Sequence, residues 1–162
     1  MGAMDQLYQQ LIIDHAKAAH GRGLASTFDG ESFQVNPTCG DKVQLRVSMQ
    51  PGEQSCLAAV SWQGDGCSIS MASTSMMTEL VVGLSHTGVE QVAEAMNQLM
   101  HSRGQGIAEE QAELLGDAIA LEGVSLYPMR IKCALLGWMA LKDALTKALA
   151  GDRRPVRLPE GI

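Results

Sequence analysis

The chain of 162 residues is poor in aromatic residues and has no excess of positive charge. Only 4% of its residues are aromatic, and 12 Lys and Arg stand against 18 Asp and Glu, which gives a net charge of −6. Such a balance provides no electrostatic footprint for nucleic acid or for an anionic membrane, so we expect neither as a partner. The sequence also contains no apolar run of the ~18–20 residues that span a bilayer.

The first residues lack a basic segment followed by an apolar one, which is the pattern of a secretory signal. We therefore expect a cytoplasmic protein. In that reducing compartment the four cysteines are more typical of metal or redox chemistry than of disulfides. Residues 1–3, ahead of a second methionine at position 4, are typical of a cloning scar and are left out of the fold prediction.

The length and the hydrophobic content of 46% predict one globular domain over residues 1–162. Hydrophobic spacing predicts a helix over 5–19, ended by the glycines at 21 and 23. Strand-like runs follow at 32–35, 43–49 and 56–62, and the turn signal at 50–53 predicts that the last two form an antiparallel hairpin.

Helical spacing returns at 69–84, 109–115 and 129–149, and a capping-box pattern at Thr87 predicts one more helix to about residue 100. Residues 117–127 show neither the apolar spacing of a helix nor the alternation of a strand. The segment 150–162 is rich in Pro, Gly and charge, which predicts a flexible tail. Because the strands are segregated from the later helices, the order of elements predicts an α+β fold.

Three cysteines lie close to predicted element ends. Cys39 follows the first strand and is two residues from Asp41 across a glycine, which permits a tight turn. Cys67 lies at the switch from strand to helix, and Cys133 lies in the first turn of the last predicted helix. We expect the dipole at these helix N-termini to favour the thiolate form of Cys67 and Cys133.

Cys39, Asp41, Cys67 and Cys133 would supply three sulfur ligands and one oxygen ligand to a tetrahedral zinc ion. The chain has no CxxC knuckle, however, and cysteine is among the residue types most often buried. Spacing alone therefore leaves a metal site and three small core residues equally open. Cys56, in mid-strand without polar neighbours, is expected in the core.

Two other sets of polar residues are expected to have structural roles. His15 lies on the apolar face of the first predicted helix, where a hydrogen-bonded core histidine is the usual outcome. The serines and threonine at 68–75 are not part of a GxxxxGK[ST] phosphate loop, so we expect them to cap and line the start of a helix.

Three motifs, NPTCGD, GDGCSISMASTSMM and RIKCALLGW, resemble the cysteine motifs of the IscU/NifU-N-terminal/SufU superfamily of iron–sulfur cluster assembly proteins. The segment LYQQLIIDH resembles the first helix of the family, so the resemblance extends over 7–149. The long segment before Cys133, and Lys132 where IscU-type scaffolds carry histidine, favour the SufU branch. One departure is at 15–20, where the family usually shows an aromatic residue and a Pro-Arg-Asn run.

The resemblance implies a small antiparallel three-stranded sheet packed against several helices. It also implies an enzyme, a zinc-dependent sulfurtransferase that accepts persulfide sulfur from a SufS-type cysteine desulfurase and passes it to the downstream iron–sulfur assembly machinery. On this basis Cys39, Asp41, Cys67 and Cys133 hold zinc. Cys39 is the persulfide acceptor with Cys133 as the second choice, and Arg130 is an auxiliary catalytic residue. Two alternatives stay open: an IscU-like scaffold for a [2Fe–2S] cluster on the same cysteines, and a structural zinc domain or adaptor.

Overall fold

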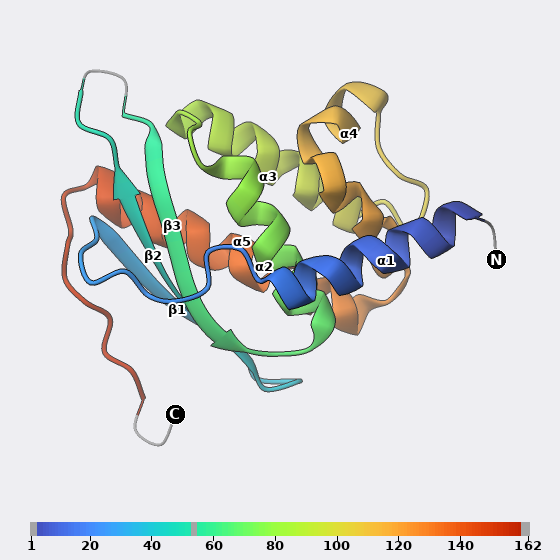
Figure 1. The fold of residues 1–162 in the computed structure, drawn as a ribbon, viewed down its shortest axis with the longest axis horizontal. Coiled ribbons are helices and arrows are strands. Elements are labelled where there is room, and N and C mark those ends of the chain that lie inside the picture. Colours follow the sequence, from blue (N-terminus) through green and yellow to red (C-terminus); the bar gives the residue numbers. More distant parts are fainter. Residues whose placement is uncertain (1–2, 53–54, 160–162) are drawn as a thin grey trace.

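The structure is a computed structural model that describes residues 3–52 and 55–159. It combines a three-stranded sheet with five α-helices and one 3₁₀ segment, which confirms the predicted α+β class (Figure 1). The strands are β1 (Gly30–Asn36), β2 (Asp41–Met49) and β3 (Leu57–Asp65). The helical elements are α1 (Ala3–Ala18), α2 (Ser68–Val81), α3 (His86–Met100), α4 (Glu109–Leu115), η1 (Gly116–Leu126) and α5 (Pro128–Leu149).

The sheet is an antiparallel meander in the order β1-β2-β3. Along β2 every second side chain is buried, with Val43, Leu45 and Val47 at 0–1% exposure, which is the period expected of a strand with one covered face. Leu45 lies opposite Trp62 on β3, as the predicted hairpin requires. Part of the predicted turn, residues 53 and 54, lies outside the described residues.

Helix α5 packs against β1 and β2 and also contacts α2, which in turn lies against α1 (Figure 1). Two glycines permit this close packing. A Cβ added at Gly30 would collide with the backbone carbonyl of Ala144 on α5, and one added at Gly137 would collide with the Thr74 side chain on α2. Both β1 and α2 therefore pack closely against α5.

Several predicted element ends shift in the structure. The helix predicted to start at Thr87 is capped instead by Ser85, whose hydroxyl accepts a hydrogen bond from the backbone N–H of Gly88. Helix α1 ends before the glycines, because Ala19 already has a positive φ of 44°. The region 117–127, for which no secondary structure is predicted, folds largely as the 3₁₀ segment η1. Helix α2 ends at Val81, whereas its predicted end is residue 84.

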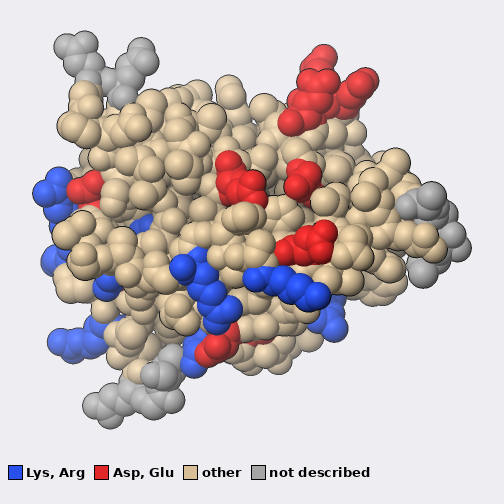
Figure 2. All heavy atoms as spheres, viewed as in Figure 1, with Lys and Arg blue, Asp and Glu red and all other residues tan. Residues whose placement is uncertain are grey.

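Residues 150–159 return along the sheet (Figure 1). The backbone N–H of Val156 donates to the carboxylate of Glu31 at 2.8 Å, and Arg153 pairs with Asp29 at 3.2 Å. Mobility of this segment stays a prediction. On the face shown in Figure 2, the largest acidic group lies over the end that carries α4, and basic side chains gather toward the sheet and the tail. In the described part of the chain, no helix has the length and apolarity needed to cross a membrane.

Candidate metal centre

Four different elements contribute the four residues of the candidate site. Cys39 is exposed in the turn between β1 and β2, and Asp41 is the first residue of β2. Gly40, between them, has a φ of +74°, a backbone conformation that glycine adopts without strain. Cys67 is the N-cap residue of α2, and Cys133 is buried in the second turn of α5.

These side chains converge. The sulfur atoms of Cys39 and Cys133 are 3.2 Å apart, and one ligand atom from each of Cys39, Asp41 and Cys133 lies within 4.8 Å of the others. Cys67 adjoins this group through Asp41, with 3.7 Å between its Sγ and the carboxylate Oδ2. The structure thus brings together all four residues that the sequence analysis names as ligands.

Asn36, the last residue of β1, orients the sulfur of Cys39. Its side-chain amide donates a hydrogen bond to the Sγ of Cys39 at 2.8 Å and lies 4.0 Å from the Sγ of Cys133. The Oδ1 of the same amide accepts from the backbone N–H of Thr38 at 3.2 Å, which fixes the direction of the Nδ2 donor. Asn36 opens the motif NPTCGD, but no sequence pattern used above marks it as a site residue.

Ser70, in the first turn of α2, joins three parts of the site. Its hydroxyl lies 2.5 Å from Oδ2 of Asp41 and 3.1 Å from the backbone carbonyl of Cys133, and the residue is 1% exposed. Gly66 permits this approach, since a Cβ there would lie 3.0 Å from Cγ of Asp41 and 3.1 Å from Cβ of Ser70.

The serines and threonine at 68–75 line the start of α2 as expected, but the expectation that they also cap it is wrong. The N-cap residue Cys67 makes no side-chain cap bond. Ser73 instead donates to the backbone carbonyl of Ala134 at 2.6 Å and accepts from the indole N–H of Trp138 at 3.0 Å. The buried serine hydroxyls of α2 therefore hydrogen-bond to neighbouring elements, which satisfies them in the interface. Thr74 instead donates to the backbone carbonyl of Ser70 within α2.

Burial raises the pKa of the Cys133 thiol. Hydrogen bonds with Cys39 and Asp41 raise this pKa further, and so do the negative charges of Cys67 and Asp41. The expectation that a helix N-terminus favours the Cys133 thiolate is therefore wrong for the metal-free site, because burial and acidic neighbours favour the protonated thiol and Cys133 lies in the second turn of α5. A cation among these groups would reverse the effect, since it stabilises their deprotonated forms. Three thiolates and one carboxylate match the ligands that zinc takes, so the residues fit a zinc ion.

A groove of about 940 Å³ runs beside Cys67, and Arg130 is among the residues that line it. Arg130 is exposed in the first turn of α5, two residues before Lys132, which is also exposed. Arg130 thus shares this groove with Cys67, and its auxiliary role stays a prediction. Cys56 has a different environment from the one expected: it is half-buried just ahead of β3, in an isolated bridge with Ser85, and not in the core.

Comparison with known proteins agrees with this fold. Residues 7–134 match the family described as NifU-like N terminal domain. The chain is 37% identical to the zinc-dependent sulfurtransferase SufU of Bacillus subtilis (strain 168), over 92% of this chain and 96% of that protein. It is 35% identical to the iron-sulfur cluster assembly scaffold protein IscU of Streptococcus pyogenes serotype M1, over 91% of this chain and 88% of that protein.

Among solved structures, the SUF-system protein FiSufU of Fervidobacterium islandicum AW-1 superposes with a TM-score of 0.71 at 30% identity, covering 89% of this chain and 99% of that one. The matched range includes all four residues of the candidate site. The chain therefore belongs to the NifU-like N-terminal domain family, as the sequence motifs indicate. The relatives named above are iron–sulfur cluster assembly proteins and a sulfurtransferase.

Proposed function

We propose that this protein is a zinc-dependent sulfurtransferase that accepts persulfide sulfur from a SufS-type cysteine desulfurase for iron–sulfur cluster assembly in the cytoplasm. The observation that carries the proposal is the unequal exposure of two adjacent thiols. Cys39 is exposed, whereas Cys133, whose sulfur is 3.2 Å away, is 2% exposed. Within the cluster, Cys39 is thus the most exposed thiol and the one best placed to meet the persulfide of another protein, whereas Cys67 is half-buried.

The chemistry follows thiol–disulfide exchange. The Cys39 thiolate attacks the outer sulfur of the desulfurase persulfide, a new S–S bond forms on Cys39, and the desulfurase cysteine leaves as a thiolate. No net oxidation or reduction occurs, since one S–S bond replaces another. The amide N–H of Asn36, 2.8 Å from the sulfur of Cys39, stabilises and aims the attacking thiolate.

Asp41, Cys67 and Cys133, together with Cys39, would hold a zinc ion here. Zinc at this site would keep the thiols deprotonated at neutral pH. The hydroxyl of Ser70 supports Asp41 as an outer hydrogen-bond partner, which is a common arrangement around ligating carboxylates. Arg130, on the groove beside Cys67, supplies positive charge where the anionic persulfide of a docked partner would enter.

The experiment is the cysteine turnover of a SufS-type desulfurase with and without this protein. We expect wild-type protein to stimulate turnover and Cys39→Ser to abolish the stimulation. Cys56→Ser is the matched control, because Cys56 is the one described cysteine outside the cluster, and it should stimulate like wild type. Full stimulation by Cys39→Ser would refute the role of Cys39 as acceptor.

A scaffold that assembles a [2Fe–2S] cluster on the same cysteines is the second candidate. It is favoured by the similarity to the Streptococcus pyogenes scaffold protein and by thiolates that suit iron–sulfur ligation as well as zinc. Zinc, iron and acid-labile sulfide in protein purified without added metal separate the two. Zinc without sulfide supports the sulfurtransferase, and iron with matching sulfide supports the scaffold.

A further inference from the structure

A second group of potential ligands lies where the end of α1 meets α2, and two of its three members are in the segment at 15–20 that departs from the family pattern. His15 is buried in α1, His20 follows the helix, and Glu79 is on α2. One ligand atom from each of the three lies within 4.8 Å of the others. Nε2 of His20 is 2.6 Å from Oε1 of Glu79, and Nδ1 of His15 is 3.9 Å from the same oxygen.

Hydrogen bonds determine which nitrogen of His15 carries the proton. The hydroxyl of Ser75 accepts from the backbone N–H of His20 at 2.9 Å, so its own proton points to Nδ1 of His15 at 3.1 Å. Nε2 of His15 lies 3.1 Å from Oδ2 of Asp117, to which it donates. The lone pair of neutral His15 is therefore on Nδ1, the nitrogen that lies near His20 and Glu79. It accepts the hydrogen bond from Ser75, so a metal at this nitrogen would replace that bond and the Ser75 hydroxyl would rotate away.

We propose that Nδ1 of His15, Nε2 of His20 and a carboxylate oxygen of Glu79 form a second site for a divalent transition metal such as zinc. Metal-ligating histidines usually donate their other ring N–H to a carboxylate, and the contact from His15 to Asp117 has this form. Two imidazole nitrogens and one carboxylate oxygen are a ligand set that zinc uses when it keeps a fourth position open.

The separations suit such an ion after small side-chain movements. Tetrahedral zinc with bonds of about 2.0–2.1 Å places its ligand atoms about 3.4 Å apart. The two separations from Glu79, 2.6 and 3.9 Å, lie on either side of that value. The side chains of His20 and Glu79 are 46% and 51% exposed, so both have room to adjust and water has access to the open position.

This site does not overlap the cysteine cluster. Glu79 and Ser70 are both on α2, and at 1.5 Å per residue they are about 13 Å apart along the helix axis. None of the residues that hold the second site is a cysteine. Metal bound there would link α1 to α2 and would bind whether or not the cysteine cluster is occupied.

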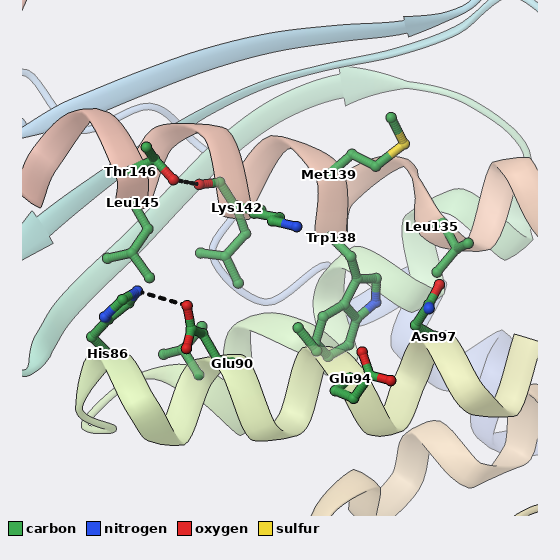
Figure 3. Close-up of a pocket in the computed structure, with 13 residues that line it drawn as sticks. His86, Glu90, Glu94, Asn97, Leu135, Trp138, Met139, Lys142, Leu145 and Thr146 are labelled. Atoms are coloured by element: carbon green, nitrogen blue, oxygen red, sulfur yellow. Dashed lines mark hydrogen bonds and ion pairs between the residues drawn. The ribbon is translucent and has the colours of Figure 1, made fainter.

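Zinc binding to the full chain tests the proposal. Metal-stripped protein is dialysed against buffered micromolar free zinc, and bound zinc per chain is measured. His20→Gln and Glu79→Gln each remove one ligand at an exposed position, and circular dichroism checks that each variant is folded. The control is His86→Gln, because His86 pairs with Glu90 on α3 at 3.1 Å and its side chain is also 46% exposed (Figure 3).

We expect wild type and His86→Gln to bind one zinc ion more per chain than His20→Gln and Glu79→Gln, with a loss of about tenfold or more in affinity for that ion. Because the result is a difference between variants, it does not depend on how much metal the cysteine cluster holds. Equal zinc content in all four proteins would overturn the proposal. A loss in His86→Gln as large as that in His20→Gln would overturn it as well.

Discussion

The sulfur atoms of Cys39 and Cys133 are 3.2 Å apart, yet Cys39 is exposed to solvent and Cys133 is buried by α5 and its neighbours. Cys39 owes its exposure to the turn between β1 and β2, and Cys133 owes its burial to the second turn of a helix packed on the sheet. One thiol can thus meet a partner protein while the other stays within the fold. This division underlies the sulfurtransferase proposal.

Ser70→Ala is expected to weaken the metal centre. The substitution removes the hydroxyl that lies 2.5 Å from the buried carboxylate of Asp41. Loss of such a partner costs about 1–3 kcal/mol in a buried polar group, and loss of an outer hydrogen bond costs about 10–100-fold in metal affinity. Competition with a zinc chelator measures the affinity. Ser68→Ala, at an exposed position of the same helix, should retain wild-type affinity, and equal affinities in the two variants would contradict the role of Ser70.

Gly40→Ala is expected to destabilise the protein by about 1 kcal/mol, since alanine must adopt the positive φ of 74° at this position. Nothing lies within 4 Å of the added methyl group, so the effect is one of backbone strain and not of collision. Urea denaturation measures it. Gly123→Ala, where the added methyl group also meets nothing within 4 Å and φ is not positive, is the control and should lose no stability.

The stability of metal-free protein is expected to fall as pH rises above about 8.5. The pKa of the Cys133 thiol is raised in the folded state, so over this range the unfolded chain releases a proton that the folded chain retains. The unfolded state then binds fewer protons, and its free energy falls relative to that of the folded state. Urea midpoints at rising pH measure this loss. Cys133→Ala should show a smaller loss over the same range, and identical slopes would contradict the raised pKa.

Asn36→Ala is expected to slow sulfur acceptance by about tenfold or more, because hydrogen bonds to charged groups contribute about 1.5–3 kcal/mol. The lost donor is the amide N–H 2.8 Å from the sulfur of Cys39. The rate of cysteine turnover by the desulfurase at saturating partner measures the effect. Gln34→Ala, a half-buried polar residue of the same strand, should leave that rate unchanged. A rate in Asn36→Ala equal to that of wild type would show that this hydrogen bond has no part in the reaction.

Much of the fold could be predicted from local patterns. The alternation of Val43, Leu45 and Val47 predicts β2, and helical spacing predicts α4 and α5 to within about a residue. The three cysteine motifs predict which residues meet. Each of these features depends on neighbours in sequence or on a motif, and so each can be recognised without knowledge of the packing.

Features that depend on distant contacts could not be predicted. Ser70 meets Asp41 and Cys133 only because α2, β2 and α5 converge, and no local pattern marks it. The raised pKa of the Cys133 thiol likewise results from its burial and from the neighbours that the fold places around it, which no local sequence pattern shows. The pairing of His20 with Glu79 across α1 and α2 is a third such contact.

The most direct test of the sulfurtransferase proposal is to locate the transferred sulfur. The protein is incubated with a SufS-type desulfurase and cysteine, free thiols and persulfides are alkylated, and the peptides are analysed by mass spectrometry. We expect one additional sulfur atom on the peptide that contains Cys39 and none on the peptides of Cys56 and Cys67. Additional sulfur on Cys133 with none on Cys39, or on no cysteine while turnover is stimulated, would contradict the proposal.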